Sequence, residues 1–66
     1  MDAIIQLEVL LNLLNTVFGK AVYYKDYVMV KRLSTIRHTI YYTNDYVYES
    51  LLKELQGLDL ELNKYE

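Results

Sequence analysis

The sequence predicts an all-α protein in which residues 1–66 form a single small helical domain. Apolar residues recur at alternating three- and four-residue spacing in both the N-terminal and the C-terminal parts, which is the spacing of one helix face. The chain has two glycines and no proline, and neither residue type occurs within residues 20–56. We expect an antiparallel helical hairpin or a three-helix unit that assembles into a homodimeric helical bundle.

The first helix is expected at about residues 2–18. Asp2 is a suitable N-cap, and Gly19 stands where a helix often ends in a left-handed residue. The helix carries a stripe of five apolar residues, Ile4, Leu7, Leu11, Leu14 and Phe18. A second apolar row widens this face, so only a narrow polar strip remains for water.

The middle of the chain allows two interpretations. Residues 20–43 are rich in valine, isoleucine, threonine and tyrosine, which favour strands. A β-hairpin at about 21–43, packed between two helices, would make the protein α+β. We favour a helix over 20–43, because the hairpin would have to turn at residues 31–34 without a turn glycine.

The last helix is expected at about residues 45–64, with Asn44 as its cap. Its apolar row again has helical spacing and consists of Tyr48, Leu51, Leu55, Leu58, Leu62 and Tyr65. Gly57 lies inside this row, which continues in phase on both sides, so we expect either a glycine tolerated within the helix or a break at this position. Because Asn44 and Asp45 are weak helix breakers, the second and third helices could also be one continuous helix.

Size and hydrophobicity together predict self-association. Hydrophobic residues make up 53% of the chain, yet a domain this short buries only about 60% of the surface of its unfolded chain. There is no cysteine and a single histidine, so neither disulfides nor an ordinary zinc site can stabilise the fold. We therefore predict a homodimer whose interface is formed by Ile4, Leu7, Leu11, Leu14 and Phe18.

No motif for catalysis or for cofactor binding is apparent. The serines, Ser34 and Ser50, and the one histidine, His38, show no spacing that would bring a nucleophile and a base together. No glycine-rich phosphate loop is present, and we expect no cofactor. The sequence favours a non-enzymatic protein–protein interaction or regulatory module that binds itself, or else a larger protein partner.

Nucleic-acid binding is the alternative function. Residues 20–43 have a net charge of +4, counted as five basic residues against Asp26, and they also hold five tyrosines. Basic groups bind phosphates and tyrosines stack on bases. The candidate contacts are Lys25, Lys31, Arg32 and Arg37. The acidic pI of about 5.2 and the six acids of residues 44–66 make this alternative the less favoured one.

Membrane insertion is not expected. The N-terminus lacks the basic stretch of a secretory signal. The apolar run over residues 3–18 is interrupted by polar side chains and is shorter than the ~20 residues of a membrane span. We expect a cytoplasmic protein.

Overall fold

Helices account for 86% of residues 2–66, the part of the chain that the computed structural model describes, and no strand occurs there. This confirms the all-α prediction, and the alternative β-hairpin at about 21–43 is wrong. The three α-helices are α1 (Ala3–Tyr23), α2 (Tyr27–His38) and α3 (Tyr48–Leu62). A π-helical turn, Thr39–Thr43, extends α2, and a 3-10 turn, Asn63–Tyr65, follows α3.

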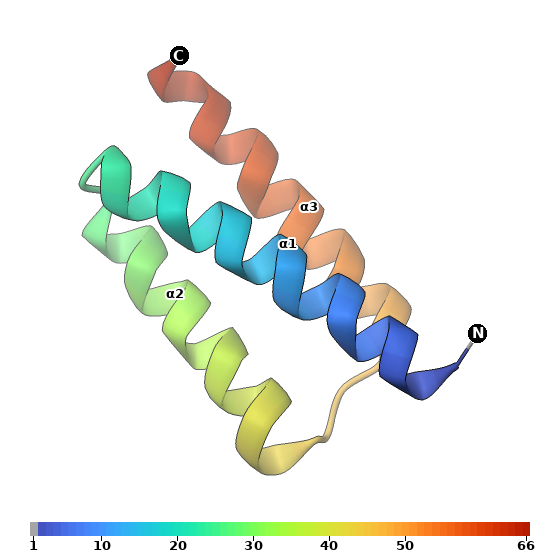
Figure 1. The fold of residues 1–66 in the computed structure, drawn as a ribbon. Helices are drawn as coiled ribbons and strands as arrows, with labels where there is room; N and C mark the ends of the chain where they lie inside the picture. The colour runs from blue at the N-terminus through green and yellow to red at the C-terminus, as the bar shows by residue number, and fades with distance from the viewer. Residues whose placement is uncertain (1) are drawn as a thin grey trace.

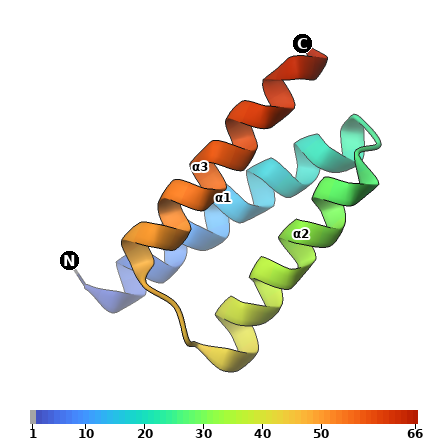
Figure 2. The same ribbon diagram turned by 180° about the vertical axis from the view of Figure 1, so that it is seen from behind.

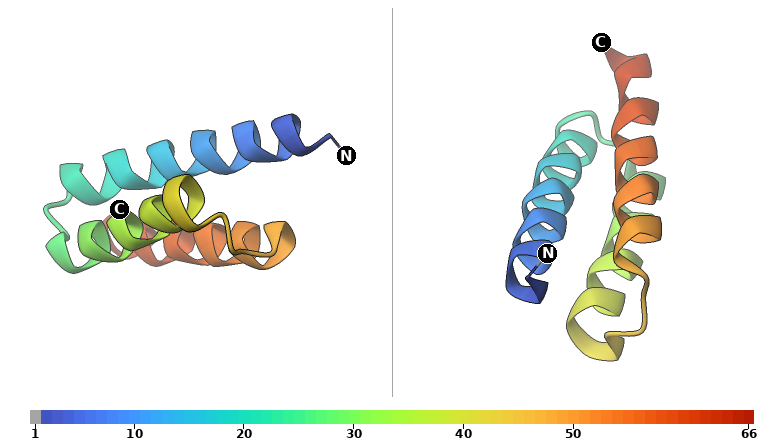
Figure 3. Two further views of the ribbon diagram at one scale, coloured as in Figure 1. Left: turned by 90° about the horizontal axis from the view of Figure 1, so that it is seen from below. Right: turned by 90° about the vertical axis from the view of Figure 1, so that its right-hand side faces the viewer.

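The helices run up, down and up again (Figure 1). Helix α2 is antiparallel to α1, whereas α3 runs parallel to α1, so the N- and C-termini lie at opposite ends of the bundle. Seen from behind and from the side, α1 packs over both α2 and α3 (Figures 2 and 3). The chain is therefore a three-helix unit, and α1 is its central helix.

Helix α1 begins as predicted and ends later than predicted. The Asp2 carboxylate accepts a hydrogen bond from the Ile4 backbone N–H at 2.8 Å, which confirms the N-cap. Gly19 does not end the helix, because Ala21, two residues later, is still part of the buried row. The left-handed residue is Lys25, at φ 59°, in the turn to α2.

The predicted single helix over 20–43 is wrong, because this turn splits it. Asp26 caps α2 by accepting a hydrogen bond from the Met29 backbone N–H at 3.1 Å. At the other end of α2, Asn44 is left-handed at φ 53° and donates its N–H to the Thr39 carbonyl at 2.9 Å. Asn44 therefore ends one helix instead of capping the next, and α2 and α3 are not continuous.

The core is wholly apolar among the described residues. Each helix contributes residues three and four positions apart, which form one row facing the other two helices. These rows are Leu10, Leu14, Val17 and Ala21 in α1; Met29, Leu33, Ile36 and Ile40 in α2 and its extension; and Leu51, Leu55, Leu58 and Leu62 in α3. Gly57 is exposed within α3, and the helix does not break there, so of the two expected outcomes the tolerated glycine is confirmed.

Candidate functional site

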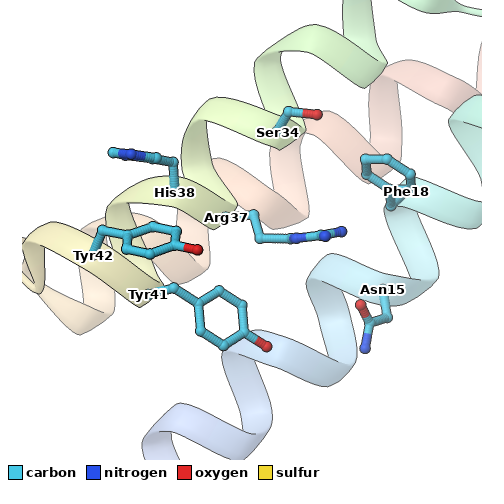
Figure 4. A pocket seen from close by; sticks show the side chains of 7 residues that line it. All are labelled: Asn15, Phe18, Ser34, Arg37, His38, Tyr41 and Tyr42. Carbon is cyan, nitrogen blue, oxygen red and sulfur yellow. The ribbon is translucent and has the colours of Figure 1, made fainter.

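A groove with a volume of about 620 Å³ lies between α1 and α2 (Figure 4). Helix α1 supplies two of its side chains, and α2 with its π-helical extension supplies the others. We call it the Arg37 groove, and its lining residues are Asn15, Phe18, Ser34, Arg37, His38, Tyr41 and Tyr42. None of these seven side chains is acidic.

Arg37 crosses the groove from α2 toward α1 (Figure 4). Its guanidinium carbon lies 5.9 Å from the centre of the Phe18 ring, within the range of a cation–π contact. Within residues 2–66, no carboxylate lies at ion-pair distance from this guanidinium. The Arg37 guanidinium therefore lies beside the Phe18 ring, and its N–H groups remain open to the groove.

Two tyrosines form the other part of the groove. Tyr41 and Tyr42 follow Arg37 in the next helical turn, and the Tyr42 hydroxyl points toward the middle of the groove (Figure 4). The His38 ring projects to the far side and packs on Tyr42, with ring centres 4.8 Å apart. Tyr41 and Tyr42 both leave most of their surface exposed.

The four predicted nucleic-acid contacts do not form one patch. Arg37 lies on the side of α2 that faces α1, whereas Arg32 lies toward α3, where its guanidinium is 4.0 Å from the Glu61 carboxylate. Lys25 is in the turn before α2, and Lys31 is exposed on the helix. Of the predicted set, only Arg37 lines the groove.

The predicted dimer interface is divided between the core and the surface. Leu14 is 1% exposed and packs inside the single chain, so its assignment to an interface with a second copy does not fit this structure. Leu11 and Phe18 are partly buried against the same core. Ile4 and Leu7, by contrast, are exposed and line a second hollow of about 460 Å³ together with Ile40, Tyr46 and Tyr48. The sequence stripe therefore has different surroundings at its two ends.

A polar cluster that the sequence analysis did not predict lies at the opposite end of the bundle. The Lys20 ammonium contacts the Asp59 carboxylate at 2.8 Å, and this hydrogen bond raises the pKa of Lys20. The Tyr65 hydroxyl donates to the Asp26 carboxylate at 2.7 Å. Each pair is separated by 39 residues along the chain, so no local pattern could have indicated it.

The Asp26 carboxylate connects the start of α2 with the end of α3. The hydrogen bonds from the Tyr65 hydroxyl and the Met29 N–H lower the pKa of Asp26, and the Lys64 ammonium at 4.0 Å acts in the same direction. The same contact raises the pKa of Tyr65, because ionised Tyr65 would no longer donate a proton to Asp26. Sequence reasoning did not identify Asp26 as an N-cap, although aspartate is one of the residue types preferred at that position.

The described part of the chain shows no arrangement of side chains that is specific to metal binding or to nucleophilic catalysis. Residues 2–66 contain no group of three metal-ligating side chains. Ser34 and His38 share the Arg37 groove, whereas Ser50 lines a separate hollow between α2 and α3. The chemistry that the groove offers is therefore binding by hydrogen-bond donors and aromatic rings.

Helix α1 is also long and apolar enough to cross a membrane, judged by its length and composition alone. The sequence argument counted an apolar run that ends at Phe18, but the helix continues to Tyr23 and has 21 residues. The length argument against a membrane span is therefore wrong. The core helix of a water-soluble bundle and a signal sequence meet the same criterion, so the criterion does not separate these cases.

Comparison of the chain with protein families, with curated proteins and with solved structures found no match.

Proposed function

We propose that the protein is a small non-enzymatic interaction module that forms a homodimer through the first turns of α1. One observation carries the proposal: four large apolar side chains are exposed within six consecutive residues. We call this surface the apolar end, and it consists of Ile4, Ile5, Leu7 and Val9.

The apolar end is exposed because of how α1 is covered. Every fully buried residue of α1 is at position 10 or later, where α2 and α3 pack on it. Along the first two turns of α1, the neighbouring helices do not cover enough surface to bury its side chains. Ile4 and Leu7, three residues apart, share one side of the helix. Exposed apolar surface is unfavourable in water, and soluble monomers rarely expose a large patch of it.

A second copy is the partner that we propose for this surface. A two-fold axis would bring the same patch of both chains together, as in most small homodimers. The hollow lined by Tyr46 and Tyr48 lies directly beside Ile4 and could receive an apolar side chain of the other copy. Tyrosine suits such a place, because its ring is apolar while its hydroxyl can stay in water.

The test is sedimentation equilibrium on the full chain and on two matched variants. Ile4→Glu places a charge in the apolar end, at a side chain that is 67% exposed. Leu60→Glu is the control, because Leu60 is 68% exposed on α3. We expect a dimer for the parent chain and for Leu60→Glu, and a folded 7.9 kDa monomer for Ile4→Glu.

Two results would contradict this proposal. The first is a parent chain that stays a folded monomer at high micromolar concentration. The second is a dimer that Ile4→Glu leaves intact, since that would place the interface on another surface. Circular dichroism of each variant separates dissociation from unfolding.

A further inference from the structure

We infer that the Arg37 groove binds a nucleotide, with the phosphate on Arg37 and the base against the rings of Tyr41 and Tyr42. The nucleotide can be free or part of a single strand, because both offer the same phosphate and an accessible base. This inference is independent of the homodimer, since no residue of the apolar end lines this groove.

The charge of the groove suits an anion. Some cations of the bundle have a carboxylate nearby, as Lys20 does in Asp59 and Arg32 does in Glu61. Among the described residues, Lys25, Lys31 and Lys53 have none at ion-pair distance. Arg37 has no such partner within residues 2–66, and the groove is lined only by basic, polar and aromatic side chains. A guanidinium presents several donors in a planar fork that matches phosphate oxygens.

The guanidinium has an aromatic neighbour before any ligand arrives. The centre of the Phe18 ring lies 5.9 Å from its central carbon, within the range of a cation–π contact. The Asn15 amide projects from α1 into the same space (Figure 4).

The aromatic part of the groove suits a base. Tyr41 is 60% exposed and Tyr42 is 78% exposed, so their rings are accessible to a ligand. The His38 ring supports Tyr42 from the side away from Arg37. Stacking on such rings is strong and tolerates every base, because each base has a π-face.

The size of the groove agrees with a ligand of this class. A volume of about 620 Å³ falls within the range of about 300–1,000 Å³ that is usual for small-molecule sites. Phosphate alone would leave the tyrosines without a partner, and a base alone would leave Arg37 without one. In duplex DNA or RNA the bases are paired and stacked, so their faces are not free to pack on tyrosines.

The test is a titration of the full chain with each probe. Calorimetry measures the affinity, and proton–nitrogen NMR spectra that include the Arg side-chain signals show where the probe binds. The probes are thymidine monophosphate, thymidine, inorganic phosphate and a short oligothymidylate. We expect the monophosphate to shift the Arg37 Nε signal and to bind at least about tenfold more tightly than thymidine or inorganic phosphate. An oligomer that binds more tightly than the monophosphate identifies the strand as the ligand, and equal affinities per site identify the free nucleotide.

Matched variants locate the site. We expect Arg37→Met to weaken binding of the monophosphate at least about tenfold, and Tyr41→Leu and Tyr42→Leu to weaken it by less. Lys31→Met and Arg32→Met remove the same charge from the same helix outside the groove, and we expect them to retain the parent affinity. All five sites are on the surface, and circular dichroism verifies that each variant is folded.

Three results would overturn the inference. The first is the absence of binding of every nucleotide probe to the folded chain at millimolar concentration. The second is inorganic phosphate binding as tightly as the monophosphate, which indicates an anion site without base recognition. The third is an equal loss in Arg37→Met, Lys31→Met and Arg32→Met, which indicates general attraction to a basic helix.

Discussion

The two ends of this bundle are built in different ways. At one end, polar side chains join all three helices: Lys20 of α1 contacts Asp59 of α3, and Tyr65 contacts Asp26 at the start of α2. At the other end lie the exposed apolar residues of the first turns of α1 and the linker of residues 44–47. Apolar side chains are also exposed near the polar contacts, among them Val22 and Tyr23 of α1. We call the first of these the polar end; the second contains the surface already named the apolar end.

The difference shows where stability and interaction are located in so small a chain. Three rows of leucine-rich residues stabilise the middle of the bundle by removing apolar surface from water. Hydrogen bonds with defined geometry then set the position of α3 relative to α1 and α2 at the polar end. The apolar end lacks such contacts among the residues that the structure describes, and this leaves its side chains available to a partner.

The largest expected effect comes from Leu14, in the middle of the bundle. Leu14→Ala removes a side chain that is packed on all sides and should lower the free energy of unfolding by about 2–5 kcal/mol. Ile4→Ala, in the same sequence stripe but at the apolar end, should change it by less than about 0.5 kcal/mol in the monomer. Urea denaturation at a concentration below that of dimer formation measures both. Equal losses would show that the two ends of the stripe are buried alike.

The next effect concerns the polar end and its dependence on pH. The native pKa of Asp26 is lowered, so its contacts stabilise the fold at pH values above its ordinary pKa of 3.8. That contribution is lost as pH falls through the lower native pKa and the carboxylate becomes protonated. We expect Asp26→Ala to lower the melting temperature at pH 7 and the difference from the parent chain to shrink toward pH 2.

Two variants sharpen this experiment. Asp45→Ala removes an exposed acid within the linker, and its melting temperature should follow that of the parent chain at every pH. Tyr65→Phe keeps the cap on Met29 but removes the hydroxyl donor, so we expect a smaller loss than in Asp26→Ala. A difference between parent and Asp26→Ala that is constant from pH 7 to pH 2 would refute the role of the ionised carboxylate.

The smallest effect tests the turn at the polar end. Lys25 is left-handed at φ 59°, a conformation that is unfavourable for a residue with a Cβ. Lys25→Gly should therefore raise the free energy of unfolding by about 0.5–1 kcal/mol. Lys31→Gly, which removes the same charge within α2, should lower it by about 1 kcal/mol. A loss of stability in Lys25→Gly would mean that the Lys25 side chain has contacts that outweigh the backbone strain.

The sequence predicted the helices better than their ends. Apolar spacing identified the rows of α1 and α3, because spacing is a property of residues close together in the chain. It misplaced the end of α1 at Gly19, since glycine is common at helix ends and is also tolerated inside helices. The β-favouring residues of the middle segment were outweighed by the burial of Met29, Leu33 and Ile36 on one helical face.

The candidate sites were predicted less well. The sequence indicated Arg37 among tyrosines, but it could not separate Arg37 from Arg32, which lies on the other side of the same helix. It also grouped Ile4 with Leu14, because a helical stripe contains no information about how far a neighbouring helix extends along it.

The sequence by itself determined that this protein is helical, because local spacing, the small number of glycines and the absence of proline act within single segments. Only the tertiary structure decided which part of the apolar stripe is buried, because that depends on how far α2 and α3 extend along α1. The tertiary structure also decided that Asp26 contacts Tyr65 and that Arg37 lies beside Phe18. These contacts join residues that are distant in the chain, and the packing of the helices alone brings them together.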